Sequence, residues 1–194
     1  MLQEVNDNIP SELKILKSIK KISADTTNKE FMLQSDLKVI DFDKFSKKYA
    51  HKFKIPILPK TVDGLYISKN DEWTFIEFKN GSIKTVDIYR KIYDSLIMLV
   101  EMGYLTWENC RNNAQYIVVY NENEYGEKYL ECRKEQNNLK IQSHIRSLAK
   151  QPRKLFDLKN LNGYLVNKTS TLTQIEFQAQ FIDLKEKEEM RYLE

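Results

Sequence analysis

Residues 61–79 of this 194-residue chain carry an acid, Asp63, at the start of one predicted strand and a Glu-x-Lys triplet, Glu77-Phe78-Lys79, at the end of the next. Carboxylates are hard oxygen ligands of the kind that Mg²⁺ and Mn²⁺ prefer, and the carbonyl of Phe78 adds another oxygen. Because side chains alternate along a strand, Glu77 and Lys79 project from one face while Phe78 projects from the other. The pattern therefore predicts a divalent-metal site formed by Asp63, Glu77 and the Phe78 carbonyl, with Lys79 beside it.

The acid-x-Lys pattern recurs in this lysine-rich chain, so its context decides which copy matters. Only Glu77 ends a run of β-forming residues, Trp73-Thr74-Phe75-Ile76, that is closed by the turn dipeptide Asn80-Gly81. The alternative interpretation is an exposed strand ion pair between Glu77 and Lys79, with Asp63 in a simple turn. We favour the metal site because both acids are predicted on adjacent strands before a long helix.

Asp63, then thirteen residues, then Glu77-Phe78-Lys79, a turn and a long amphipathic helix together resemble the active-site core of the PD-(D/E)xK phosphodiesterase superfamily, which includes restriction endonucleases and Holliday-junction resolvases. The resemblance covers roughly residues 40–120. One departure is that Val62 stands where a proline often precedes the first acid, and the nearest proline is Pro59.

This resemblance implies an α/β fold with a restriction endonuclease-like core: helix, three-stranded meander, helix and returning strand, in a mixed sheet flanked by helices. We expect N- and C-terminal helical additions around it, within a single domain over 1–194 whose C-terminal addition spans about 121–194. The implied activity is hydrolysis of phosphodiester bonds with Mg²⁺ or Mn²⁺, on DNA rather than RNA.

The same resemblance assigns roles to individual side chains. Asp63 and Glu77 would be the metal ligands, and Lys79 would either activate the attacking water or stabilise charge on the phosphate. Two adjacent acids favour the cationic form of Lys79, which points to the electrostatic role. Lys91 is a further catalytic candidate that would reach the phosphate, although an ion pair with Asp87 or Asp94 on its own helix is the interpretation we favour.

One more carboxylate is a candidate ligand. In the superfamily, the helix before the first acid sometimes lends another acid, and Asp43 occupies that position here. The favoured alternative is that Asp43 is a first-turn acid facing the helix dipole.

Composition restricts the class of protein. Hydrophobic residues make up 41% and charged residues 30% of the chain, as in ordinary soluble globular proteins. The chain has two cysteines and two histidines without CxxC or HxxxH spacing, which disfavours a structural zinc site and a disulfide framework. It shows no signal-peptide pattern at residues 1–10 and no apolar run of membrane-spanning length, so we expect no membrane association and a cytoplasmic location.

The net charge of +3 is unevenly distributed. Two segments, 44–62 and 136–156, contain only basic charges and flank the acidic region in the sequence. Phosphate backbones bind such segments, although solvated surface is an equally good interpretation of either one. The predicted nucleic-acid contacts are Lys52, Lys54, Lys60, Lys84, Arg146, Lys150, Arg153 and Lys154. Tyr89 and Tyr93 would stack on a base if exposed.

Periodicity and capping signals predict the elements that position these residues. A helix is expected from Ser11, and the region 24–39 receives no assignment. The remaining expected helices lie over 41–51, capped by Asp41, from 82–85 to Met102, closed by Gly103, and over 139–150, a basic segment. Strands are expected over 63–68, 73–79, 114–120 and 162–167. A terminal helix is expected to begin at the capping box of Thr173 and Glu176, and its apolar residues available for packing are Ile175, Phe177, Phe181, Ile182 and Leu184.

A second hypothesis comes from a different functional class. The chain would keep this fold as a nucleic-acid-binding or assembly subunit that does not cut. The basic segment 140–154 and the unexplained C-terminal third motivate it, and that third would then contact a second copy or a partner protein.

Overall fold

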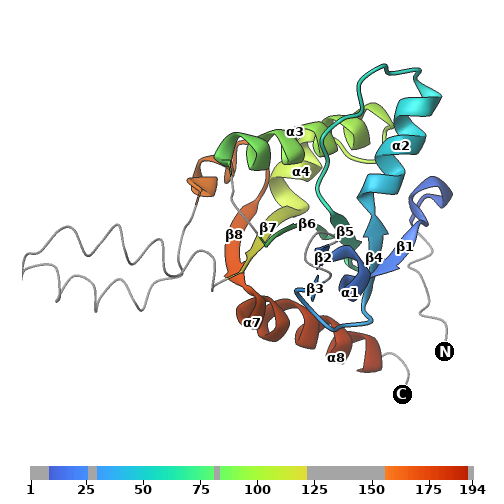
Figure 1. Cartoon of the computed structure of the whole chain (residues 1–194). Coiled ribbons are helices and arrows are strands. Elements are labelled where there is room, and N and C mark those ends of the chain that lie inside the picture. Colours follow the sequence, from blue (N-terminus) through green and yellow to red (C-terminus); the bar gives the residue numbers. More distant parts are fainter. Residues whose placement is uncertain (1–8, 26–29, 81–83, 122–155, 192–194) are drawn as a thin grey trace, which may run out of the picture.

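The computed structural model describes residues 9–25, 30–80, 84–121 and 156–191, and its centre is a six-stranded mixed sheet (Figure 1). The strand order is β1-β4-β5-β6-β7-β8, antiparallel from β1 to β6 and parallel from β6 to β8. A separate two-stranded ribbon pairs β2 (Ala24–Asp25) with β3 (Glu30–Phe31). The six strands of the main sheet are β1 (Leu16–Ser18), β4 (Lys38–Asp41), β5 (Gly64–Ile67), β6 (Trp73–Lys79), β7 (Ala114–Tyr120) and β8 (Lys168–Thr173). The chain is therefore of the α/β class, as expected from the sequence.

Helices cover both faces of this sheet (Figure 1). On one face lie α2 (Phe42–Lys52), α3 (Thr85–Glu101) and α4 (Trp107–Asn113), and on the other lie α1 (Ile19–Ile22), α7 (Gln174–Phe177) and α8 (Asp183–Arg191). Alternation along the strands supplies two cores: Phe75, Tyr116 and Val118 pack with the α2 and α3 side chains, whereas Ile76, Ile117 and Val119 pack with Phe177 and Phe181. The buried residues of the central strands thus alternate between two hydrophobic cores, one on each face of the sheet.

The helix predicted over 41–51 is confirmed, including its cap. The side chain of Asp41 accepts a hydrogen bond of 3.1 Å from the backbone N–H of Lys44, which satisfies one of the free N–H groups of the first helical turn. Phe42, Phe45 and Tyr49 form the buried side of α2. This helix connects β4 to β5, so the antiparallel set β4-β5-β6 is interrupted by a helix rather than joined by turns alone.

The long helix after the acid-x-Lys triplet is also confirmed, as α3. Its buried stripe consists of Ile88, Ile92, Leu96 and Leu99, which recur at spacings of three and four. Gly103 ends it with φ of +74°, its N–H donates to the Val100 carbonyl, and the N–H of Tyr104 donates to the Leu99 carbonyl. This pair of bonds is a Schellman motif, which requires a residue that tolerates the left-handed region.

The helix predicted from Ser11 is wrong. The chain instead forms a short 3-10 turn, η1 (Ser11–Leu13), then strand β1 and the single-turn helix α1. Leu13 packs in the α3-side core and Ile19 in the α7-side core, while Leu16 is exposed and pairs with Ile40 of β4. Pairing of β1 with β4 separates residues that the sequence pattern had placed on one helical stripe, so tertiary context overrides local periodicity.

The strand predicted over 162–167 is wrong as well. That stretch follows a 3-10 turn, η2 (Leu158–Leu161), and contains Gly163 with φ of +69°; the strand, β8, begins at Lys168. The run Lys168–Thr173 is rich in threonine, a β-branched residue, and it pairs in parallel with β7.

The capping box of Thr173 and Glu176 is present and opens the terminal helical run, in which a π-helical turn, η3 (Gln178–Ile182), joins α7 to α8. Phe177, Phe181 and Ile182 are buried as expected, but Ile175 and Leu184 are exposed. All of 122–135 and all of the predicted helix over 139–150 fall outside the described residues. Within the described ranges, no helix has the length and apolar character needed to cross a membrane.

Candidate functional site

Asp63 and Glu77 meet where β5 begins and β6 ends. The backbone N–H of Asp63 donates to the Ile76 carbonyl (3.1 Å), and its Oδ2 accepts from the N–H of Phe78 (2.7 Å). Glu77 and Lys79 lie on the α3 side of β6, whereas Phe78 packs against the ring of Phe177 on the opposite side. The alternation predicted for the triplet is therefore confirmed.

Two ammonium groups face this pair of acids. Nζ of Lys91, from α3, lies 3.1 Å from Oδ1 of Asp63, 2.8 Å from Oε1 of Glu77 and 2.9 Å from its Oε2. Nζ of Lys79 lies 2.7 Å from Oε1 of Glu77. The four predicted catalytic residues thus form one cluster.

The favoured pairing of Lys91 with acids of its own helix is wrong. Asp94 pairs with Arg90 (3.5 Å) and Asp87 pairs with Lys60 (2.8 Å). The reason is the segment before β5, which lies along α3: the N–H of Lys60 donates to Asp94 and the N–H of Val62 donates to Oγ of Ser95. This docking places Asp63 over Lys91.

Burial dominates the electrostatics of Glu77. Its side chain has no exposed surface, and burial, assisted by the charge of Asp63, raises the pKa of Glu77 to about 7 against the opposing effect of Lys91 and Lys79. Burial acts to lower the pKa of Lys91, but Asp63 and Glu77 outweigh it, so the pKa of Lys91 lies above its ordinary value. The cluster keeps Lys91 positively charged.

One oxygen of Glu77 lacks directional hydrogen bonding. Oε1 is fully buried, and although two ammonium nitrogens approach it, no group among the described residues meets it with the angular geometry of a hydrogen bond. A buried carboxylate oxygen of this kind is a strong candidate for a cation ligand.

Asp43 lies near the cluster without joining it. Burial, followed by the charge of Asp63, raises the pKa of Asp43, and Oγ1 of Thr61 donates to its Oδ1 over 3.4 Å. In the described part of the chain, no group of three or more His, Cys, Asp or Glu side chains converges on one point. The role of Asp43 as a further ligand stays a prediction, as does that of the Phe78 carbonyl.

Two residues near the site were not singled out from the sequence. Ser95 bridges the N–H of Val62 to the Lys91 carbonyl, and the hydroxyl of the fully buried Tyr116 donates to the Ile88 carbonyl (3.3 Å). Ser95 had a readable signal, because it is a polar residue at a buried position of the apolar α3 stripe. Tyr116 had none beyond its place in a predicted central strand.

The predicted phosphate contacts are dispersed. Lys60 pairs with Asp87 beside the cluster, whereas Lys52, paired with Glu12 (3.4 Å), lies at the far end of α2, about 14 Å along the helix from Asp43. Lys54 and Lys84 are exposed. The other four, Arg146, Lys150, Arg153 and Lys154, lie outside the described residues.

The two tyrosines proposed to stack on bases bind protein groups. The hydroxyl of Tyr89 donates to the Asp157 carbonyl (2.8 Å), and Tyr93 interacts with Tyr164. Both tyrosines therefore attach the η2 region to α3.

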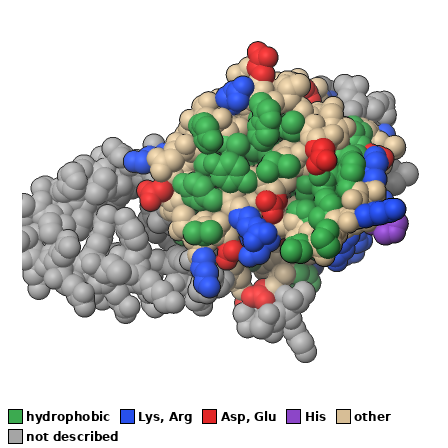
Figure 2. Space-filling model, turned by 90° about the horizontal axis from the view of Figure 1, so that it is seen from above, with side chains coloured by type: hydrophobic (Ala, Val, Ile, Leu, Met, Phe, Trp, Pro, Cys, Tyr) green, Lys and Arg blue, Asp and Glu red, His purple; other side chains and the backbone are tan. Residues whose placement is uncertain are grey.

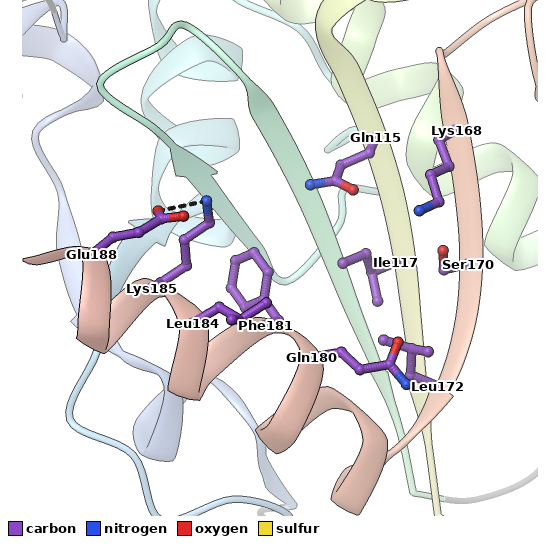
Figure 3. Close-up of a pocket in the computed structure, with 10 residues that line it drawn as sticks. All are labelled: Gln115, Ile117, Lys168, Ser170, Leu172, Gln180, Phe181, Leu184, Lys185 and Glu188. Atoms are coloured by element: carbon purple, nitrogen blue, oxygen red, sulfur yellow. Dashed lines mark hydrogen bonds and ion pairs between the residues drawn. The ribbon is translucent and has the colours of Figure 1, made fainter.

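Among the described residues, two hollows lie away from the cluster. Figure 2 views the molecule from the side of α2 and α3, where hydrophobic side chains cover much of the face, and a groove of about 320 Å³ lies there between Ile57, Leu58 and Ile97. On the other side of the sheet, a cavity of about 170 Å³ lies between β7, β8 and α8 (Figure 3). Polar side chains gather around it, with Lys185 paired to Glu188 at 2.9 Å.

Comparison of the chain with protein-family models, with curated proteins and with solved structures finds no match. The function of the protein is therefore inferred from the geometry of the cluster.

Proposed function

We propose that this protein is a Mg²⁺- or Mn²⁺-dependent nuclease that hydrolyses phosphodiester bonds, in DNA rather than RNA. The observation that carries the proposal is the convergence of two carboxylates from neighbouring strands on one cation, the ammonium of Lys91, at 2.8–3.1 Å. Asp63 and Glu77 therefore already present their oxygens to a common point that suits a positive charge.

The residues at this point fit a divalent ion. Mg²⁺ is usually held by one or two carboxylates together with water and substrate phosphate, so a cluster of two acids is sufficient. The buried Oε1 of Glu77, which two ammonium nitrogens approach at 2.7 Å and 2.8 Å, already accepts positive charge and would serve as a ligand once an ammonium is displaced. When bound, the ion would act as a Lewis acid that polarises the scissile phosphate.

The chain's own residues would position the metal ligands and stabilise charge on the substrate. Asp63 is positioned by its bond from the Phe78 amide, and Glu77 by its place inside β6, so neither ligand has to be ordered on binding. Lys79, whose side chain is 20% exposed, would stabilise negative charge on the phosphate or on the attacking water. Lys60, paired with Asp87 at the edge of the cluster, would contact a neighbouring phosphate.

The fold supports the same proposal at a finer level. The antiparallel order β4-β5-β6, followed by the helix α3 and by β7 parallel to β6, supports the core expected of a PD-(D/E)xK nuclease in its strand order and second helix. The position of α2 between β4 and β5, instead of before three joined strands, is the difference. A cytoplasmic location and a single catalytic domain belong to this proposal.

A cleavage assay tests the function. Single-stranded, duplex and branched DNA would be incubated with Mg²⁺, with Mn²⁺ or with a chelator, using the wild type, Asp63→Asn and Lys79→Met. We expect metal-dependent cleavage that both substitutions reduce by at least about a hundredfold, as for loss of a group that acts in the transition state. Glu72→Gln and Lys159→Met, at exposed positions outside the cluster, serve as matched controls. Cleavage that survives both Asp63→Asn and Lys79→Met would refute the assignment.

One observation favours the alternative of a binding subunit that does not cut. Lys91 and Lys79 already neutralise Asp63 and Glu77, so the cluster is electrically complete without a metal. A thermal-shift titration separates the two functions, because a ligand that binds the folded state raises its melting temperature. A nuclease should be stabilised by Mn²⁺ in the wild type and not in Glu77→Gln, whereas a binding subunit should show no shift in either.

A further inference from the structure

Lys91 occupies the point at which a metal would bind. Its Nζ contacts three carboxylate oxygens from two residues, at 3.1 Å, 2.8 Å and 2.9 Å. A divalent ion held by Asp63 and Glu77 would need the same carboxylate oxygens that this ammonium now contacts. The ammonium and a metal ion would therefore compete for these oxygens.

Of the groups involved, Lys91 is the one able to move. Glu77 has no exposed side-chain surface and is held in β6 between β5 and β7, and Asp63 is tied to the Phe78 amide. The side chain of Lys91 is 21% exposed and has a long flexible stem. Its backbone stays in place, because its carbonyl accepts a hydrogen bond from Ser95 (2.7 Å) within α3.

The charges of the cluster indicate where the displaced ammonium would go. With Asp63 and Glu77 ionised and Lys79 and Lys91 protonated, the cluster is neutral. A divalent ion gives it an excess positive charge and creates a repulsion between the ion and Lys91. A phosphodiester group, with its negative charge, reduces this excess and offers the ammonium a new partner.

We propose that Lys91 is an internal counter-ion that fills the cation position in the free protein and transfers to a substrate phosphate when the metal enters, so that metal and nucleic acid bind cooperatively through this side chain. This inference rests on the proposed function. It separates Lys91 from Lys79, whose Nζ, among the described residues, is paired with Oε1 of Glu77 and not with Asp63. Lys91 is then a binding residue that makes metal binding depend on the presence of nucleic acid.

The first test measures Mn²⁺ binding by calorimetry, using the full chain as wild type, Lys91→Met and Lys79→Met, with and without a short duplex of phosphorothioate DNA. Without DNA, we expect Lys91→Met to bind Mn²⁺ about tenfold or more tightly than the wild type, because a competing cation in contact with both ligands is gone. Adding the duplex should raise the Mn²⁺ affinity of the wild type and of Lys79→Met, but much less that of Lys91→Met.

The possible results separate the two proposals. If Mn²⁺ binds none of the three proteins, the metal-dependent function itself fails. If wild type and Lys91→Met bind Mn²⁺ equally, or Lys91→Met binds it more weakly, the metal site stands and the counter-ion role of Lys91 is overturned.

A second measurement needs no variant and therefore does not depend on the folding of Lys91→Met. Acetylation of lysine side chains in the wild type would be followed residue by residue by mass spectrometry. Mn²⁺ should increase the labelling of Lys91 severalfold, since it releases the amine from its two partners, and phosphorothioate DNA should suppress the increase. The labelling of the exposed Lys159 should stay unchanged by Mn²⁺. Labelling of Lys91 that Mn²⁺ leaves unchanged or lowers would refute the displacement.

Discussion

Glu77 should make the stability of the metal-free protein depend on pH in a direction opposite to that of most acidic residues. Burial, followed by the charge of Asp63, raises the pKa of Glu77 from 4.5 to about 7. The folded protein therefore holds this proton more tightly than the unfolded chain does. The resulting stabilisation is fully present below about pH 4.5 and is lost as the pH rises through about 7.

The size of this pH effect on stability follows from the interval between the two pKa values of Glu77, 4.5 in the unfolded chain and about 7 in the folded protein. Each pH unit between 4.5 and 7 corresponds to about 1.4 kcal/mol, so Glu77 should remove about 3 kcal/mol from the free energy of unfolding across this range. Glu77→Gln keeps the shape of the side chain and cannot titrate. The difference in unfolding free energy between wild type and Glu77→Gln should consequently change by about 3 kcal/mol between pH 4.5 and pH 8, at the expense of the wild type.

Urea unfolding in a chelating buffer measures this difference at a series of pH values. The change of stability with pH that is common to both proteins cancels in the comparison, which isolates Glu77. Glu72→Gln, at an exposed position just before β6, should follow the wild type. A difference between wild type and Glu77→Gln that varies by less than about 0.5 kcal/mol over this range would show that Glu77 titrates normally in the folded state, and the burial argument would be refuted.

Three further substitutions and one control substitution test the fold by urea unfolding. Thr173→Ala removes the capping box and should cost about 1 kcal/mol; an unchanged midpoint would mean that the cap is not needed. Phe177→Ala removes a buried ring that stacks on Phe181 and should cost about 3–5 kcal/mol, whereas the exposed Ile175→Ala should stay within about 0.5 kcal/mol, and equal costs would contradict the assigned packing. Gly103→Ala places a side chain at φ of +74° and should cost about 1 kcal/mol, and a gain in stability would refute the Schellman motif.

The sequence by itself determined the elements whose signals are local. The cap at Asp41, the end of α3 at Gly103 and the capping box at Thr173 each depend on a side chain or a backbone conformation within a few residues of the element that it ends. The placement of Glu77 and Lys79 on one face of a strand likewise follows from the alternation of any strand. These predictions hold because their physical cause is contained in a short stretch of chain.

Only the tertiary structure decided which secondary structure a segment adopts, or which ion-pair partner a side chain takes, where the local sequence permits more than one. Ser11 to Ile22 has a helical pattern, yet β4 pairs with its centre and divides the chain into a turn, a strand and a short helix. Lys91 had acids of its own helix within reach at standard spacings, but it contacts Asp63 and Glu77. A partner of this kind is selected by how a segment distant in the sequence packs against the helix. That packing minimises the free energy of the whole core, which no local pattern contains.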